Sequence, residues 1–391
     1  MTERGTMQLR EVGKTGAKVS PLGFGMMRLP MKDGGQAEAL TPADQVDVDE
    51  SIKMLRHAIG NGINYVDTAF NYIGGMSEKI TGMALEDGYR EKVYLATKSP
   101  TWMYKSEDDF DSLLAKQLQR LKTDYIDFYM LHSINGGSWK RCLKYGAVDA
   151  IKKAKADGKV KHIGFSFHDD YDLFVEVLDS ADWDFVQIQL NYYDANYQAG
   201  IKGMKLAAER GMGVIVMEPL RGGFLVDVPA KVQDVFDNAA NKRTPVEWSF
   251  DWLWNLPEVS VVLSGMGTME EVDQNIASAQ KAAIGMMDSN DLATIEAAKE
   301  AFSSYEVVPC TGCNYCVEYC PEKIAIPYNF NAYNLEYLKD LDAAKFYYQN
   351  EVTKFGKDAS HCTSCATCES ICPQHIEISS IMPGIDEKLG A

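Results

Sequence analysis

The chain has 391 residues, of which 46% are hydrophobic and 24% charged, a composition typical of a globular protein with a sizeable core. At about 150 residues per domain this length predicts two or three domains, although one α/β barrel can take up about 250 residues. The 39 Lys and Arg against 56 Asp and Glu give a formal net charge of −17, which argues against nucleic acid and anionic membrane surfaces as partners. The sequence has no long apolar run and no signal-like start, so we expect a cytoplasmic protein.

Eight short apolar runs recur along the first three quarters of the chain, with charged segments of helical spacing between them. The runs cover Leu22–Leu29, Ile63–Ala69, Val93–Lys98, Tyr125–His132, Val160–Phe167, Phe185–Asn191, Gly213–Pro219 and Val259–Gly265. Segments such as Glu107–Leu121 and Val148–Asp157 have the length of single helices, and strands that alternate with helices indicate a parallel sheet. Landmark residues near the ends of the last seven runs, from Asp67 to Ser264, are spread over 197 residues. The six steps between them average about 33 residues, which fits a closed (β/α)8 TIM barrel. An open doubly wound sheet is the alternative, but no Gly-x-Gly-x-x-Gly sequence follows the first strand.

Eight of the nine cysteines lie in the last 82 residues, where they form two similar bursts. The bursts read Cys310-x2-Cys313-x2-Cys316-x3-Cys320-Pro321 and Cys362-x2-Cys365-x2-Cys368-x3-Cys372-Pro373. Three cysteines at this spacing curl the backbone around one face of a cubane, and the fourth, before proline, reaches a different cluster. The repeat therefore implies two 4Fe–4S clusters with crossed ligation.

Crossed ligation assigns each cluster three cysteines from one burst and the last cysteine of the other. One cluster takes Cys310, Cys313, Cys316 and Cys372, and the other takes Cys362, Cys365, Cys368 and Cys320. Tetrahedral zinc and disulfides are the alternatives; zinc sites use paired rather than tripled cysteines, and the cytosol disfavours disulfides. Cys142 stands alone, and we interpret it as lying outside any site.

Both bursts match the bacterial-type two-cluster ferredoxin domain, which the last part of the chain resembles. The 41-residue spacer between the bursts is longer than in compact members of that family. We expect one or two helices over Asn331–Lys354, with Leu335, Leu338 and Leu341 on a common face, and we expect this insertion to contact the barrel.

These patterns divide the chain into a barrel over residues 1–300 and a small α+β ferredoxin-like iron–sulfur domain over residues 301–391. Residues 302–391 contain 12 acidic and 6 basic side chains, a net charge of −6. Two clusters with eight thiolates add roughly −4 to this charge. We therefore expect a basic redox partner near the clusters.

Three of the apolar runs end in residues with reactive side chains: Asp67 ends the second, Lys98 the third and His132 the fourth. Tyr72 lies five residues beyond Asp67, in the loop that follows. Reactive side chains of such barrels lie at the C-terminal ends of strands. Each residue alone has an ordinary structural explanation, but four at consecutive strand ends favour a catalytic site.

This set of side chains suits proton transfer to a carbonyl oxygen. A tyrosine, with a pKa of about 10, is a weak acid at neutral pH, and a lysine ammonium beside it stabilises the phenolate. Asp67 could hold Lys98 charged and oriented, and His132 could hydrogen-bond the carbonyl oxygen. The arrangement would donate a proton to an oxygen that gains charge as hydride arrives at its carbon.

The same residues resemble the aldo-keto reductase family. The matching segments are Gly-Lys-Thr-Gly-Ala-Lys-Val-Ser (13–20), Gly-Phe-Gly-Met-Met-Arg-Leu (23–29), Asp-Thr-Ala-Phe-Asn-Tyr (67–72), Ala-Thr-Lys (96–98) and Leu-His (131–132). The resemblance implies that Tyr72 is the proton donor, that Lys98 and Asp67 tune it, and that His132 orients the carbonyl. It also implies a nicotinamide cofactor across the barrel mouth.

The cofactor positions depart from the family pattern at three places. The family's Ser-Asn pair after the fifth strand reads Ser166-Phe167, its Gln-x-x-Tyr-Asn pattern reads Gln187-Ile-Gln-Leu-Asn191, and Glu271 stands where a basic residue precedes Asn275. The contacts that the resemblance assigns to the cofactor are Ser166, Gln187, Asn191, Ser264, Gly265, Thr268 and Asn275. A carboxylate at position 271 would repel a 2′-phosphate, so we expect NADH to be favoured over NADPH.

A second possibility is that nicotinamide binds weakly and electrons come through the clusters. A 4Fe–4S cluster passes one electron at a time, whereas carbonyl reduction needs two, and a flavin normally joins such steps. The sequence carries no flavin signature; the phosphate site near Ser264–Thr268 suggests one by fold analogy alone.

The sequence thus predicts an oxidoreductase that links NAD(P)H to a small carbonyl or alcohol and carries an electron-transfer module. The alternatives are an electron-transfer subunit of a larger complex and a reductase whose clusters are purely structural. Five apolar residues lie where the family lines its pocket, and they indicate either an apolar or ring-bearing substrate or packing at the barrel mouth. They are Phe24, Met26, Phe70, Trp102 and Tyr104.

Overall fold

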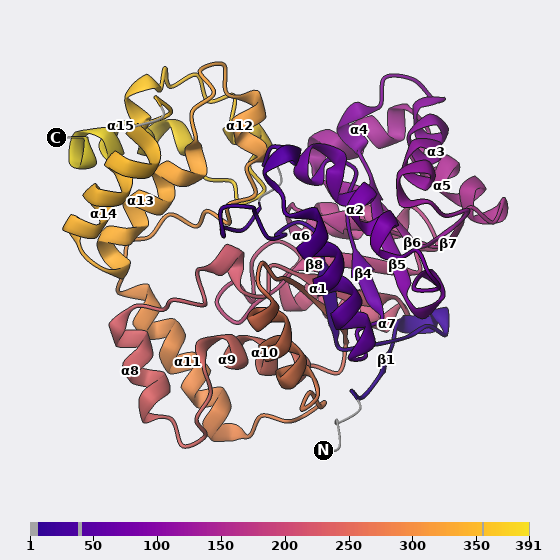
Figure 1. Ribbon diagram of the computed structural model, residues 1–391, viewed down its shortest axis with the longest axis horizontal. Helices are drawn as coiled ribbons and strands as arrows, with labels where there is room; N and C mark the ends of the chain where they lie inside the picture. The colour runs from indigo at the N-terminus through magenta and orange to yellow at the C-terminus, as the bar shows by residue number, and fades with distance from the viewer. Residues whose placement is uncertain (1–6, 38–40, 354–355, 391) are drawn as a thin grey trace. The chain divides into compact units, whose positions relative to one another are not determined.

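Eight parallel strands close into a barrel in the computed structural model, which describes residues 7–37, 41–353 and 356–390 (Figure 1). The strands are β3 (Leu22–Gly25), β4 (Tyr65–Asp67), β5 (Tyr94–Ser99), β6 (Ile126–Ile134), β7 (Val160–Phe167), β8 (Phe185–Gln189), β9 (Gly213–Met217) and β10 (Val259–Gly265). Neighbours in sequence are neighbours in the barrel, and β10 pairs with β3 to close it. The predicted (β/α)8 barrel and its eight strands are confirmed, with ends that differ by a few residues.

Helices follow the strands along the chain, and many of them bury one apolar face. They are α1 (Val48–Gly60), α2 (Met76–Ala84), α3 (Asp109–Leu121), α4 (Gly136–Lys144), α5 (Ala147–Ala156), α6 (Tyr171–Asp179), α7 (Gly200–Glu209), α8 (Ala230–Asn238), α9 (Pro245–Trp254), α10 (Met269–Ala279) and α11 (Ser289–Ser303). On α3 the buried side chains include Phe110, Leu114 and Leu121, which recur at helical spacing. The helices predicted over 107–121 and 148–157 are therefore α3 and α5.

A two-stranded hairpin precedes the barrel, and the sequence analysis missed it. Its strands are β1 (Arg10–Glu11) and β2 (Lys18–Val19). The buried guanidinium of Arg10 donates hydrogen bonds to the carbonyl oxygens of Trp254 and Val259, next to the start of β10. Burial lowers the pKa of Arg10 to about 10. These bonds tie the hairpin to the N-terminal end of the barrel.

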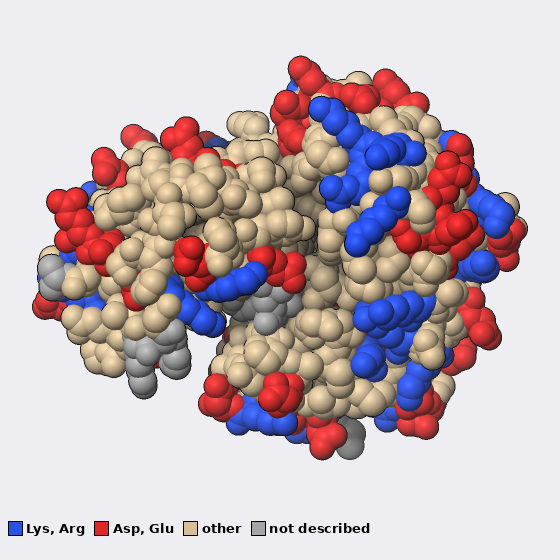
Figure 2. Space-filling model, turned by 90° about the horizontal axis from the view of Figure 1, so that it is seen from above, with Lys and Arg blue, Asp and Glu red and all other residues tan. Residues whose placement is uncertain are grey.

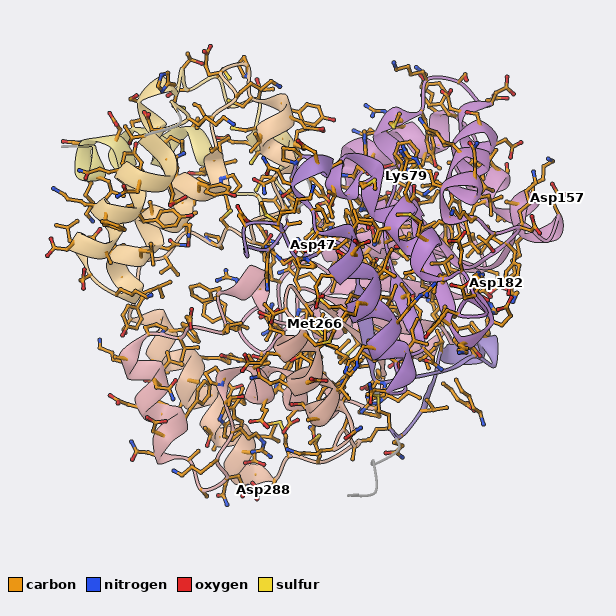
Figure 3. All side chains as sticks on the ribbon, in the orientation of Figure 1. Asp47, Lys79, Asp157, Asp182, Met266 and Asp288 are labelled. Atoms are coloured by element: carbon orange, nitrogen blue, oxygen red, sulfur yellow. The ribbon has the colours of Figure 1, made fainter. Side chains whose placement is uncertain are left out.

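Two residues labelled in Figure 3 show where the N-terminal ends of the barrel strands lie, opposite the ends that carry the predicted catalytic residues. The labelled Asp157 and Asp182 lie in the loops that precede β7 and β8. The labelled Met266 lies at the other end, directly after β10, and is buried. The residues at the C-terminal strand ends are therefore the ones that can meet at one mouth.

The chain divides into two compact units. One comprises Met1–Pro219 and Phe250–Met286, and the other comprises Leu220–Ser249 and Met287–Ala391. All the strands in the described part of the chain lie in the first unit. In the second unit the rings of Phe224 and Phe302 pack with centroids 5.2 Å apart, so α11 and the segment after β9 join the cysteine-rich tail. The boundary predicted at residue 300 stays a prediction.

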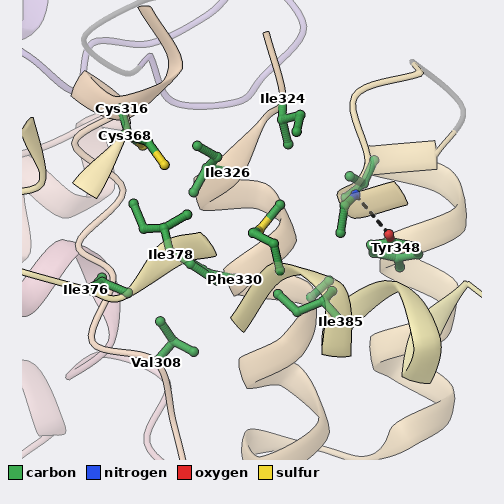
Figure 4. Close-up of a cluster of buried hydrophobic side chains, with 14 of the residues drawn as sticks. Val308, Cys316, Ile324, Ile326, Phe330, Tyr348, Cys368, Ile376, Ile378 and Ile385 are labelled. Carbon is green, nitrogen blue, oxygen red and sulfur yellow. Dashed lines mark hydrogen bonds between the residues drawn. The ribbon is translucent and has the colours of Figure 1, made fainter. Parts of the chain in front are cut away.

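The cysteine-rich tail contains helices around a small apolar core. They are α12 (Tyr315–Tyr319), α13 (Ile326–Leu338), α14 (Leu341–Tyr347) with a π-helical turn at Tyr348–Val352, and α15 (Ile378–Leu389). Figure 4 shows the core, in which Cys316 and Cys368 lie among Ile326, Phe330 and Ile378. The described residues after Ser303 form no strand, so only the helical part of the predicted α+β arrangement is seen.

The predicted common leucine face of the insertion is wrong. α13 ends at Leu338, and Asp340 caps a new helix by accepting a hydrogen bond from the Ala343 amide. This break turns Leu341 away from the face of Leu335, and Leu341 is 40% exposed. The predicted contact of this insertion with the barrel stays a prediction, and Lys354 lies outside the described residues.

Two surface properties bear on the partners expected from composition. Within the described ranges, no helix is both long enough and apolar enough to cross a membrane. Acidic and basic side chains are interspersed over the face shown in Figure 2.

Candidate functional site

The four predicted catalytic side chains meet at the C-terminal strand ends. Asp67 is the last residue of β4, Lys98 lies in β5, His132 in β6, and Tyr72 begins the turn after β4. The Lys98 ammonium donates hydrogen bonds to Asp67 Oδ1 at 2.5 Å, to the Thr68 carbonyl oxygen at 2.9 Å and to the Tyr72 hydroxyl at 3.2 Å. The rings of Tyr72 and His132 meet edge to face with centroids 6.0 Å apart. The structure therefore brings all four residues together.

Burial sets the protonation behaviour of this group. Desolvation lowers the pKa of Lys98 and raises that of Asp67, and their ion pair opposes both shifts. Burial also lowers the pKa of His132 well below its ordinary value, and the charges of Lys98 and His168 add to this effect. A neutral imidazole beside a lysine–aspartate ion pair can donate a hydrogen bond without carrying a charge of its own.

A buried polar network behind Lys98 was missed by the sequence analysis. Gln117 on α3 donates to the Lys98 carbonyl oxygen at 3.0 Å and to Glu78 Oε1 at 2.6 Å. Glu78 on α2 is fully buried and also accepts from Thr97 Oγ1 at 2.8 Å. The network fixes the strand that carries Lys98. A polar Gln117 on the apolar face of α3 was the signal in the sequence that could have revealed it.

Arg120 extends this network to the loop that carries Tyr72. Its Nη1 donates to Glu78 Oε2 and to the Phe70 carbonyl oxygen, each at 3.0 Å. Ile73, directly after Tyr72, has φ of +53°, a left-handed conformation that is strained for a β-branched residue. Arg120 thus holds a strained turn in place next to the tyrosine.

Three of the predicted cofactor residues lie in or just after β7 and β8. Ser166 Oγ accepts from the Ser133 amide at 2.7 Å, and Asn191 Nδ2 donates to the Glu218 carbonyl oxygen at 3.2 Å. Gln187 Nε2 lies 3.4 Å from Asp67 Oδ2, so Gln187 contacts the predicted catalytic group directly. Their predicted contacts with nicotinamide stay predictions.

The other four predicted cofactor residues lie at the end of β10, at the N-cap of α10 and within that helix. They are Ser264, Gly265, Thr268 and Asn275. Asn275 Nδ2 donates to Ser264 Oγ at 3.2 Å, and Thr268 caps α10 by accepting from the Glu271 amide. A helix N-terminus at this position can bind an anion, so the residues form a coherent candidate phosphate site.

Glu271 lies in the first turn of α10 and is held there by two contacts. Its Oε2 accepts from the Gly267 amide at 2.7 Å, and both carboxylate oxygens accept from Gln36 Nε2 at 2.8–2.9 Å. The carboxylate therefore takes up an amide of the helix start that would otherwise attract an anion.

Four of the five pocket residues predicted from the family are buried in the described structure. Phe24 and Met26 have no exposed surface, Tyr104 bonds to Ser99, and the Phe70 ring packs on Arg120. Trp102 is half-buried, and its ring lies 5.1 Å from that of His132. Barrel packing therefore accounts for four of them, and Trp102 is the one that borders His132.

His168 is a further residue that the sequence analysis missed. It is buried directly after β7, and its charge is among those that lower the pKa of His132. A histidine just past a strand end, like His132, was the signal available in the sequence. The C-terminal end of the barrel strands thus holds two neighbouring imidazoles.

The eight clustered cysteines gather around two cavities, in the pairing expected for crossed ligation. The first cavity is lined by Cys310, Cys313, Cys316 and Cys372, and the second by Cys320, Cys362, Cys365 and Cys368. No cysteine of the chain forms a disulfide. Cys142 lies in the barrel unit, where burial raises the pKa of its thiol to about 12, as expected for a residue outside any site.

Comparisons with known proteins match two successive parts of the chain to two different families. The family model described as the Aldo/keto reductase family matches residues 21–300, and the model described as the 4Fe-4S dicluster domain matches residues 309–377. An L-galactose dehydrogenase from Arabidopsis thaliana is 29% identical over 75% of this chain and 95% of its own. An NADH-specific methylglyoxal reductase from Escherichia coli is 27% identical over 68% of this chain and 92% of its own.

Solved structures of the same fold are also similar. The holo form of the aldo-keto reductase AKR11C1 from Bacillus halodurans aligns with a TM-score of 0.62 and 23% identity, over 75% of this chain and 96% of that one. An aldo-keto reductase from Klebsiella pneumoniae, solved in complex with NADPH, aligns with a TM-score of 0.60 and 22% identity, over 74% and 94%. From its barrel and the extent of the family match, the chain belongs to the aldo/keto reductase family of oxidoreductases, with a 4Fe-4S dicluster domain after the barrel.

Proposed function

We propose that the barrel reduces a carbonyl group, or oxidises the corresponding alcohol, with Tyr72 as the proton donor. The observation that carries the proposal is the Lys98 ammonium, which lies 2.5 Å from Asp67 Oδ1 and 3.2 Å from the Tyr72 hydroxyl. A cation beside a phenol stabilises the phenolate that remains after proton transfer. Asp67 in turn keeps Lys98 charged in a buried position.

His132 orients the substrate in this mechanism. Because burial keeps its pKa low, its imidazole is neutral at neutral pH and donates a hydrogen bond rather than a proton. The carbonyl oxygen would then lie between His132 and Tyr72. A hydride brings both electrons to the carbon, and Tyr72 supplies the proton to the oxygen, so the reduction is balanced.

Replacing Tyr72 with Phe tests this proposal. General acid catalysis contributes about 10²–10⁴-fold, so carbonyl turnover by Tyr72→Phe should fall by that factor. Iron content should not change, because Tyr72 is remote in sequence from the cysteines. Unchanged turnover would instead favour a scaffold role for the barrel in an electron-transfer complex.

The hydride source that we propose is NAD(P)H, which supplies a hydride to the carbonyl carbon when bound. Ser166, Gln187 and Asn191 would hold its nicotinamide end. Gln187 supports this assignment, since its buried Oε1 has no hydrogen-bond partner among the described residues and suits the amide N–H of a carboxamide.

NADH is the form that we propose the barrel prefers. The carboxylate of Glu271, fixed by Gly267 and Gln36, would repel a 2′-phosphate at the start of α10. Dissociation constants for NADH and NADPH test the preference, and Glu271→Arg should narrow the difference between them. Tighter binding of NADPH by the unaltered protein would refute it.

The tail, in this proposal, holds two 4Fe–4S clusters that transfer electrons. The cysteines would bind iron as thiolates, and each quartet lines one cavity with apolar side chains around it. Anaerobic purification should give about eight iron and eight sulfide per chain. Adding NADH and NADPH while following the cluster absorbance, with a separate extraction for flavin, would trace the flow of electrons.

Structural clusters are a second candidate, favoured by the place of the cysteines in the core. Cys316, Cys320 and Cys368 are buried within the apolar cluster of the tail. Clusters there would hold the tail together whether or not they carry electrons. Turnover measured with oxidised and then with reduced clusters separates the two, because structural clusters predict equal rates.

The substrate that we propose is a small carbonyl or alcohol with an apolar or ring-bearing group. Trp102 supports this choice, because it borders His132 and remains partly exposed. Trp102→Ala should raise KM for ring-bearing substrates more than for short aliphatic ones. We also propose a cytoplasmic location, where thiols remain reduced.

A further inference from the structure

The two cysteine cavities differ in exposure. In the first, Cys316 is 6% exposed and the polar lining residues Thr311 and Gln374 are buried. In the second, Cys365 is exposed, and so is every residue of the segment 363–367 around it. One side of the second cavity therefore consists of a single exposed turn of chain.

The two cavities also differ in charge. No charged side chain lines the first cavity within the described residues. The second is lined by the exposed Glu322 and by Ser379, which donates hydrogen bonds of 2.7 Å and 2.6 Å from its amide and hydroxyl to Glu369 Oε1. One carboxylate thus lines the second cavity and another is bonded to a lining residue, beside an exposed segment, 363–367, that contains no charged residue.

The first cavity has a different neighbour. A Cβ at Gly222 would lie 2.2 Å from the Thr311 carbonyl oxygen, so the first cysteine loop packs directly on the Arg221–Gly223 turn. This turn belongs to the same compact unit and follows shortly after β9 in the sequence. Arg221 is 4% exposed and has φ of +50°, so a buried cation accompanies this contact.

We propose that the cluster held by Cys320, Cys362, Cys365 and Cys368 is the entry point for electrons, and that its exposed 363–367 segment is the docking surface for a basic one-electron redox protein. This inference rests on the proposed function of the tail. One electron would leave the partner and reduce this cluster, which we call the outer cluster. The electron would then pass to the inner cluster, the one held by Cys310, Cys313, Cys316 and Cys372, and leave the outer cluster oxidised again.

The charges support this direction. Carboxylates near a cluster disfavour its reduction, and a nearby buried arginine favours it, so Glu322 and Glu369 lower the potential of the outer cluster relative to the inner one. Electron transfer from the outer to the inner cluster is then thermodynamically favourable. The same carboxylates attract a partner whose contact face is basic.

Electron paramagnetic resonance of the reduced full-length protein tests which cluster is outer. Glu322→Gln should raise the potential of one cluster, and Gln374→Leu, within the first cavity, should alter the other, so the two variants identify the two signals. A soluble gadolinium complex should broaden the signal marked by Glu322→Gln more strongly. Stronger broadening of the signal marked by Gln374→Leu would overturn the proposal.

Stopped-flow reduction by the methyl viologen radical, a cationic one-electron donor, tests the charge argument. Reversing one charge near the entry point, in Glu322→Lys, should slow reduction by about threefold at low salt. Glu351→Lys is the matched control, because Glu351 is exposed and lines neither cavity. Equal rates in Glu322→Lys and the unaltered protein, or equal slowing in both variants, would refute the docking surface. A protein without iron or a reducible signal would instead refute the proposed function.

Discussion

The predicted catalytic end of the barrel and the cysteine quartets differ in what holds their side chains in place. In the barrel, Lys98 donates to three oxygen atoms of the protein, and Gln117 holds its backbone from behind. In the tail, each quartet joins segments from both bursts around a cavity with a mostly apolar lining. The barrel site is thus assembled by protein contacts, whereas the quartets suit an inorganic group that links the two bursts. The same change, removal of one side chain, should therefore have different consequences in the two regions.

Loss of a cluster ligand should give the largest effect and should be confined to the tail. Cys316→Ser removes a buried ligand from one quartet, so iron content should fall to about half, and the tail should lose its cooperative unfolding transition. Iron analysis and calorimetry measure both. Cys142→Ser is the control, a buried cysteine outside the quartets that should leave iron unchanged. Equal iron loss in both variants would contradict the ligand assignment.

Breaking the buried ion pair should give the next largest effect, in the barrel. Lys98→Met leaves Asp67, which is 3% exposed, without its cation, and should reduce the free energy of unfolding by about 3–5 kcal/mol. Adding Asp67→Asn to this variant should restore part of the stability, since no buried charge remains. Urea unfolding of the single and double variants measures the cycle, and an additive loss in the double variant would show that the pair is not coupled.

The neutral state of His132 should appear as a pH dependence of stability. Because its pKa in the folded protein is lowered, the unfolded chain binds a proton below about pH 6.5 that the folded chain does not. Stability is therefore lost as pH falls below this value, by up to about 1.4 kcal/mol per pH unit. His132→Gln should flatten the profile, while His375→Gln, which changes an exposed histidine, should not. Parallel profiles for the unaltered protein and His132→Gln would contradict the assignment.

The barrel could be predicted from sequence because its parallel strands are buried on both faces and appear as apolar runs. The hairpin strands Arg10–Glu11 and Lys18–Val19 could not, since two residues show no periodicity. The break between α13 and α14, before Leu341, could have been predicted, because Asp is a favoured N-cap residue and Asp340 stands at that position.

The candidate sites divide in the same way. The spacing within the cysteine bursts is enough to predict which cysteines share a cluster. The position of Lys98 and His132 at strand ends predicts where they lie, without knowledge of side-chain packing. The contact of Gln187 with Asp67 depends on side chains that meet across the barrel interior, between β8 and β4, and no spacing along the chain encodes it. Arg120 acts on Tyr72 through the backbone of Phe70, a contact invisible in a pattern of residue types.

Arg120 offers the finest test of a site assembled by protein contacts. Arg120→Lys keeps the charge but loses the planar fork that reaches both Phe70 and Glu78, so the strained turn at Ile73 should loosen. We expect a loss of about 1 kcal/mol in stability and a several-fold fall in kcat with little change in KM, since Tyr72 would be misplaced but the substrate still bound. Lys116→Met is the control, because this exposed cation of α3 lies over the same Phe70 ring without a bond to the loop. A fall in kcat in Lys116→Met with none in Arg120→Lys would instead show that the positive charge over Phe70 matters and the hydrogen bond to its carbonyl does not.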